Sequence, residues 1–187
     1  MTGFPGSAKY PKRTALSSGN IYRYGRGRPP CACPYCTTGL WALACQRPGA
    51  SVSAATWRRA AAAVPEASAV AGTFAAGSGP NCFGTVKAAA GVVEARSTWM
   101  LQEPFSEWLA ERAEPVRGTS QDAVPGTVLV WHENDQLAHA AITIGDGWAL
   151  SKPSQSWSSP TMVWTVSESI TSWPLAGTRL SRHRLKR

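Results

Sequence analysis

Three segments of the chain have apolar residues at helical spacing. Residues 51–64 begin with Ser51 as a candidate N-cap and end before Pro65, and the segment of about 82–97 follows Asn81 as its candidate cap. A third segment, about 103–114, has Pro104 near its first position, where proline is favoured. The pattern predicts three amphipathic helices.

After residue 125 the apolar residues no longer follow helical spacing, and the sequence becomes typical of β-strands. Residues 126–131 are rich in β-branched residues, a polar turn follows at 132–136, and residues 137–144 form a return strand. Gly145-Asp146-Gly147 predicts a tight turn into a strand at 148–151, and residues 162–166 predict one more strand. Helices followed by an antiparallel meander predict an α+β domain, with the helices packed on one face of the sheet.

The ends of the chain differ from its middle in charge. Residues 1–59 hold nine Lys or Arg and no acidic residue, residues 60–178 hold five basic and all eleven acidic residues, and residues 179–187 hold five basic residues. We therefore expect a basic, Cys-rich N-terminal extension (1–50), a folded domain (51–175) and a basic tail (176–187). The basic extension predicts an anionic partner, a nucleic acid or a carrier.

Length and composition limit the class of protein. The chain has 187 residues, 43% of them hydrophobic and 16% charged, which is enough apolar sequence for one packed core. No run of 18 apolar residues occurs, and residues 1–13 lack an apolar secretory segment. We expect no membrane span and a cytoplasmic location, unless a dedicated secretion system exports the protein.

Cys82 and His139 are the best candidates for chemistry. A thiol at a helix N-terminus meets the positive end of the helix dipole and free backbone N–H groups, which favour the thiolate and can hold an oxyanion. A thiol nucleophile also needs a base, and His139 lies in the second strand of the predicted hairpin, which can face the start of the helix.

Three segments resemble the NlpC/P60 cysteine peptidases, in the same order and spacing. Residues 81–86 (N-C-F-G-T-V) resemble the family's D-C-S-G-L/F-V motif, and residues 125–131 (P-G-T-V-L-V-W) resemble its P-G-D-L/V-V/L-V/F-F strand. Residues 139–147 (H-A-A-I-T-I-G-D-G) resemble its H-V-G/A-I/L-Y-L/I-G-D/N-G segment. The resemblance covers about residues 51–151.

The resemblance implies a papain-like fold and a thiol peptidase, amidase or acyltransferase that needs no cofactor. Cys82 would be the nucleophile and His139 the general base, with Ser151, about a dozen positions later, or Gln155 in its place, orienting the imidazole. The expected substrate is a peptide or an amide-containing metabolite. The residues expected to contact it are Asn81, Phe83 and Trp148.

Four further cysteines lie in the N-terminal extension: Cys31, Cys33, Cys36 and Cys45. Four thiolates within fifteen residues are suited to a structural zinc ion or an iron–sulfur cluster, and unliganded thiols and redox disulfides are further alternatives. A zinc site in this basic segment would indicate a second function class, a nucleic-acid or carrier-binding protein with a non-catalytic domain.

Overall fold

The computed structural model describes residues 52–173 and 177–186 of the chain. They form an α+β domain, with helices and a six-stranded sheet in which every neighbouring pair of strands is antiparallel. The helices are α1 (Ala54–Ala60), α2 (Ala67–Val70), α3 (Cys82–Ala89), the 3-10 helix η1 (Val93–Ser97), α4 (Gln102–Arg112) and α5 (Val166–Thr171). The strands are β1 (Ala113–Val116), β2 (Thr127–Glu133), β3 (Gln136–Gly145), β4 (Trp148–Ser151), β5 (Met162–Thr165) and β6 (Thr178–Leu185).

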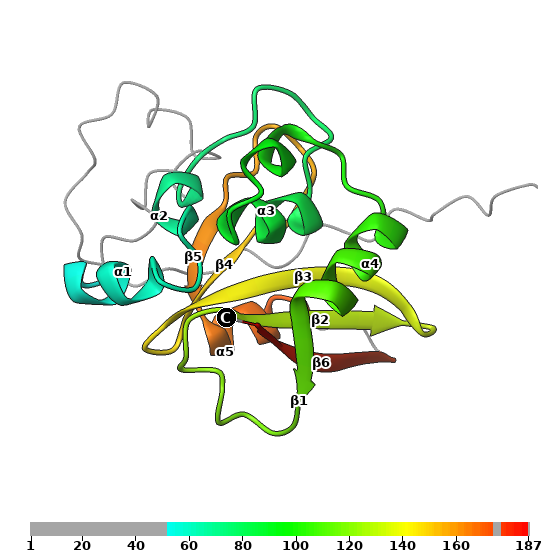
Figure 1. Ribbon diagram of the computed structural model, residues 1–187. Coiled ribbons are helices and arrows are strands. Elements are labelled where there is room, and N and C mark those ends of the chain that lie inside the picture. Colours follow the sequence, from blue (N-terminus) through cyan, green and yellow to red (C-terminus); the bar gives the residue numbers. More distant parts are fainter. Residues whose placement is uncertain (1–51, 174–176, 187) are drawn as a thin grey trace, which may run out of the picture. The chain divides into compact units, whose positions relative to one another are not determined.

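The strand order is β1-β6-β2-β3-β4-β5, and helices cover both faces of the sheet. On one face, α1 to α4 pack on side chains of β2, β3 and β4 such as Val130 and Ile142 (Figure 1). On the opposite face, Val166 and Ile170 of α5 pack against Leu129 and Ala141. We predicted helices on one face only; α5 gives β2 and β3 a second buried face, which explains their nearly unbroken apolar sequence.

Side chains cap the starts of α1 and α3. The Asn81 side chain accepts a hydrogen bond from the backbone N–H of Gly84, which confirms the predicted cap of α3. In α1, Ser53 rather than Ser51 accepts from Thr56 N–H. Both helices are shorter than predicted, since α1 ends at Ala60 and α3 at Ala89, before Gly91 and η1.

The hairpin between β2 and β3 confirms the predicted strand pair. Its two turn residues, Asn134 and Asp135, have φ values of 50° and 61°. Positive φ at both central residues is typical of the type I′ turn, whose twist matches that of the flanking strands. The turn pairs Glu133 with Gln136, and a register shift between Trp131 and His132 then places His139 opposite Trp131.

We predicted a basic tail at 176–187, and this prediction was wrong for residues 178–185. These residues form β6, which lies between β1 and β2 in the middle of one half of the sheet. Alternating polar and basic residues conceal this strand in the sequence, and pairing on both sides supplies the backbone hydrogen bonds that stabilise it. We also did not predict α2, α5 or β1, in which Pro115 is tolerated because β1 is an edge strand.

Within residues 52–173 and 177–186, no helix is both long and apolar enough to cross a membrane.

Candidate active site

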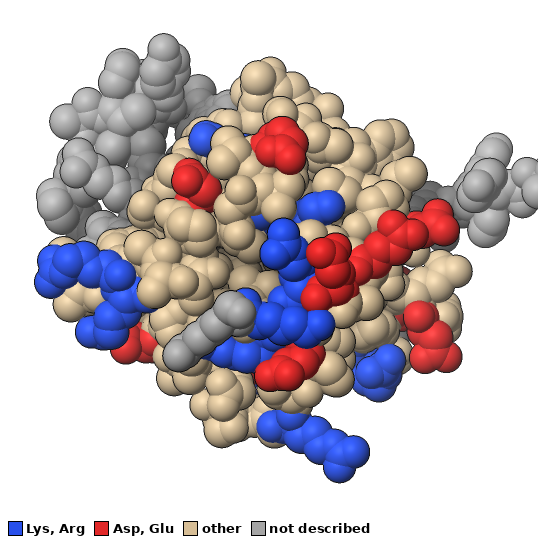
Figure 2. Space-filling view, in the orientation of Figure 1, with Lys and Arg blue, Asp and Glu red and all other residues tan. Residues whose placement is uncertain are grey.

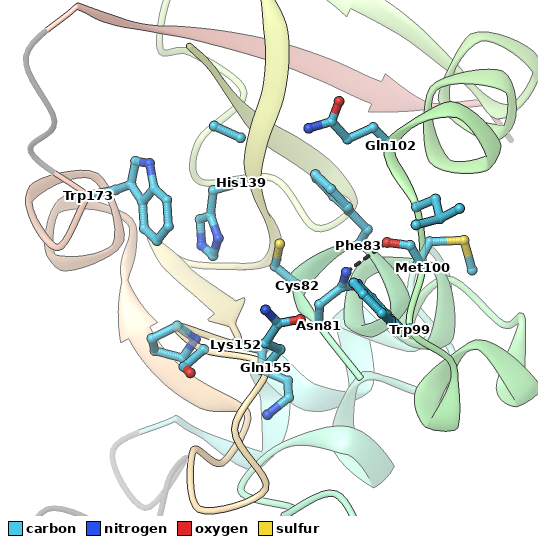
Figure 3. A pocket seen from close by; sticks show the side chains of 14 residues that line it. Asn81, Cys82, Phe83, Trp99, Met100, Gln102, His139, Lys152, Gln155 and Trp173 are labelled. Atoms are coloured by element: carbon cyan, nitrogen blue, oxygen red, sulfur yellow. Dashed lines mark hydrogen bonds between the residues drawn. The ribbon is translucent and has the colours of Figure 1, made fainter. Parts of the chain in front are cut away.

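Cys82 and His139 line one cavity, as we predicted from the sequence. The cavity has a volume of about 620 Å³ and lies where the start of α3 meets β3 and the residues after β4 (Figure 3). Its size is within the usual range for small-molecule sites. The remaining described residues that line it include Asn81, Phe83, Trp99, Leu101, Lys152, Gln155 and Trp173.

Cys82 begins α3, and its position depends on tight packing of that helix. A Cβ added to Gly84 would lie 2.5 Å from the carbonyl oxygen of Ala95 and 3.0 Å from that of Thr98. The Asn81 side chain caps the helix with its oxygen and donates from Nδ2 to the Met100 carbonyl at 2.7 Å (Figure 3). Asn81 therefore ties the start of α3 to the segment that carries the cavity's outer wall.

His139 contacts Ser151 on the neighbouring strand. Its Nε2 lies 3.1 Å from Ser151 Oγ, so Nδ1 is the ring nitrogen left to face a reacting group. The imidazole stacks on Trp173 at a centroid distance of 4.3 Å and an interplanar angle of 8°, and it contacts Trp131 at 5.2 Å. The ring is 3% exposed, held between two indoles and one hydroxyl.

Burial decides the charge state of this pair. It raises the pKa of the Cys82 thiol to about 11, although the backbone N–H groups of Ala140, Phe83 and Cys82 and the charge of Lys152 all lower that pKa. Burial also lowers the pKa of His139 to about 4. The backbone N–H groups lower the thiol pKa, as we expected for a helix N-terminus, but desolvation has the larger effect. Both shifts favour the uncharged forms of the two side chains, a thiol and a neutral imidazole.

Lys152 lines the cavity and was not among the site residues predicted from the sequence. It is 4% exposed, and Nζ donates to the carbonyl oxygens of Ser159 at 2.6 Å and Ser156 at 3.3 Å. It is the one charged residue among the described residues that line the cavity. Burial lowers its pKa, while a thiolate at Cys82 would raise it. A lysine at a strand end is ordinarily solvated, so nothing in the local sequence distinguished it.

The other predicted site residues divide into two groups. Asn81, Phe83 and Gln155 line the cavity, and Phe83 also stacks on Phe105 at 4.6 Å. Gln155 accepts a hydrogen bond from Gly79 N–H through its backbone carbonyl at 2.9 Å, whereas the partner of His139 is Ser151. Trp148 is not brought to the cavity; it packs against the hydrophobic core at the start of β4.

The predicted zinc ligands Cys31, Cys33, Cys36 and Cys45 lie outside the described residues, as does the basic segment expected to bind an anionic partner. In the described part of the chain, no group of three His, Cys, Asp or Glu residues is arranged to hold a metal ion.

Searches of protein-family models, curated proteins and solved structures found no match to this chain.

Proposed function

We propose that the protein is a cysteine-dependent amide hydrolase or acyltransferase of the NlpC/P60 type, in which Cys82 attacks a carbonyl carbon. The observation that carries the proposal is one cavity lined by a cysteine at a helix N-terminus and by a histidine hydrogen-bonded to Ser151. The resemblance of residues 81–86, 125–131 and 139–147 to that family supports it. The substrate class is a peptide or an amide-containing metabolite.

The neutral state of both side chains determines the order of proton transfer. In the proposed attack, Cys82 Sγ forms a bond to the carbonyl carbon while its proton moves to His139 Nδ1, in line with general base catalysis. The imidazolium then returns the proton to the leaving amine as the C–N bond breaks, which leaves a thioester. Water or a second amine attacks the thioester, giving hydrolysis or acyl transfer.

Backbone N–H groups supply the electrostatic stabilisation in this proposal. The backbone N–H groups of Cys82, Phe83 and Ala140 each lower the pKa of the Cys82 thiol. Preorganised donors of this kind stabilise developing negative charge without reorganising during the reaction. Lys152 adds one positive charge to a cavity that has no acidic residue among its described lining residues, so it stabilises the thiolate as it forms.

The outer wall of the cavity favours a substrate with an apolar group. Trp99 and Leu101 line the cavity and are 63% and 59% exposed, although large apolar side chains are usually buried. Indole and isobutyl side chains in this position would cover an aromatic or aliphatic portion of the substrate.

Acylation by p-nitrophenyl acetate tests the proposal on the full chain. We expect one acetyl group per chain, found on Cys82 by intact-mass analysis and peptide mapping, with p-nitrophenol released in a burst. The chain contains its own reference thiols, because it has five cysteines and four of them lie before residue 46. Equal acylation rates at all five cysteines would contradict the proposal and leave the binding protein as the remaining alternative.

A further inference from the structure

A second cavity lies at the other half of the sheet and shares no described lining residue with the cavity of Cys82. Its volume is about 490 Å³, and residues of β6, the end of β1 and His132 of β2 line it. The β1–β6 register ends with Val116 opposite Arg182, so the first residues of β6 extend beyond the end of β1 and form the cavity floor.

Two histidines meet at one serine in this cavity. Ser181 Oγ lies 2.8 Å from His132 Nε2 and 3.1 Å from His183 Nε2. A hydroxyl has one hydrogen and two lone pairs. Because Oγ also lies 3.5 Å from the Val130 carbonyl, it can donate there and accept an N–H from each imidazole. The hydrogen-bond network therefore accommodates both histidines in the protonated state.

The charged groups around the pair are mostly basic. Arg117 and Arg179 line the cavity, and Arg182 lines it while making a bidentate ion pair with Asp122 at 2.7 and 2.9 Å. Asp135 lies 4.0 Å from Arg179 but is 97% exposed, and no acidic residue is among the described lining residues. Lys and Arg side chains gather on the face that carries β1 and β6 (Figure 2).

This arrangement favours an oxyanion over a cation. Three arginines line the cavity and no carboxylate is among its described lining residues, which disfavours a metal ion, whereas guanidinium and imidazolium N–H groups match the geometry of phosphate oxygens. In the empty cavity, burial and the charge of Arg179 lower the pKa of both His132 and His183. The charge of His132 also lowers the pKa of His183, whereas Asp135 partly raises that of His132. The negative charge of a bound anion raises the pKa of both histidines and so opposes the lowering by neighbouring positive charges.

We propose that this cavity binds the phosphate group of a small ester between Arg117, Arg179 and the His132–Ser181–His183 chain, and that the histidines take up protons as it binds. The volume leaves room for the rest of the ligand beside the phosphate. The inference does not depend on the function proposed for Cys82.

Isothermal titration of the full chain tests this site, with inorganic sulfate and inorganic phosphate as probes at constant ionic strength. Sulfate stays fully ionised between pH 5.5 and 8, so a change in its affinity reports protonation of the protein. We expect sulfate to bind at least about tenfold more tightly at pH 5.5 than at pH 8, because up to two protons are linked to binding. Proton uptake is measured from the dependence of the binding heat on the buffer.

Variants locate the site. Arg179→Gln and His183→Gln should each weaken sulfate binding by at least about fivefold, since each removes one charged donor. Arg58→Gln, which removes an exposed charge from the last turn of α1, should leave the affinity unchanged. Because Arg179 is 62% exposed, its replacement leaves the fold intact, and thermal unfolding checks this for His183→Gln. No binding, or equal losses in all three variants, would overturn the proposal.

Discussion

The two cavities place histidines in opposite electrostatic settings. His139 is 3% exposed, lies between two indoles, and belongs to a cavity with one buried cation. His132 and His183 are only partly buried and share a serine beside two arginines. Burial keeps His139 neutral so that it can accept a proton from a thiol, whereas the second pair can charge when an anion arrives. The surroundings of an imidazole, more than the residue itself, determine its chemistry.

The largest expected effect is on the acylation rate of Cys82, and it distinguishes the histidine of the first cavity from that of the second. His139→Ala should slow acetylation of Cys82 by p-nitrophenyl acetate by about 10²- to 10⁴-fold, the usual contribution of a general base. His132→Ala is the matched control and should leave the rate unchanged, because it removes a histidine from the other cavity. A similar rate loss in both variants, read by intact-mass kinetics, would show that the loss does not come from base catalysis at Cys82.

The next effect concerns stability in acid. The pKa of His139 is about 4 in the folded protein against an ordinary value of 6.5, so the unfolded chain binds the proton more tightly. His139 therefore contributes stability above pH 6.5 that is lost as the pH falls toward 4, about 3 kcal/mol in all.

Urea unfolding at pH 7 and pH 4.5 checks this. When the pH is lowered from 7 to 4.5, the free energy of unfolding should fall less in His139→Gln than in the wild type, because the variant lacks the buried imidazole. The carboxylates titrate equally in both proteins and do not contribute to the difference. His132→Gln is the control and should retain most of the wild-type dependence. An identical pH dependence in wild type and His139→Gln would contradict a buried, neutral His139.

Alanine substitutions at two glycines compare the packing beside the two cavities. Gly84→Ala places a methyl group against backbone oxygen, so we expect a loss of about 2–3 kcal/mol in the free energy of unfolding. Gly118 lines the second cavity with φ of +71° and open space around its Cβ position, so Gly118→Ala should cost about 1 kcal/mol from backbone conformation alone. Denaturant unfolding of the two variants side by side measures the difference, and the reverse order would contradict the close packing of α3.

The smallest effect on the acylation rate concerns Lys152. Lys152→Gln keeps N–H donors for the Ser156 and Ser159 carbonyls but removes the charge, so the pKa of Cys82 should rise further and acylation should slow by about tenfold, or 1.4 kcal/mol. Lys87→Gln removes a charge from the same helix as Cys82, outside the cavity lining, and should have no effect. The acylation rate of Cys82, measured between pH 7 and 10 in both variants, checks this prediction. Equal rates in wild type and Lys152→Gln would remove Lys152 from the proposed mechanism.

Local sequence was sufficient for several parts of the fold and of the site. Asn81 as the cap of α3, the β2–β3 hairpin and the β4 strand all depend on residues close in sequence. Ser151 as a partner of His139 was predicted from the family resemblance, with Gln155 as the alternative, and the structure shows the contact with Ser151. Strand register alone did not predict it, because the β3–β4 ladder has a register shift between Thr143 and Gly145. The length of α3 was not predictable in this way, since it ends where the chain turns toward η1.

The sequence by itself determined that Cys82 begins a helix and that His139 lies on a neighbouring strand, because capping and alternation act over a few residues. Only the tertiary structure decided that β6 joins the sheet, that Lys152 faces the cavity, and that Trp173 covers His139. It also decided the protonation of the pair, since desolvation depends on everything packed around a group and not on its neighbours in the chain.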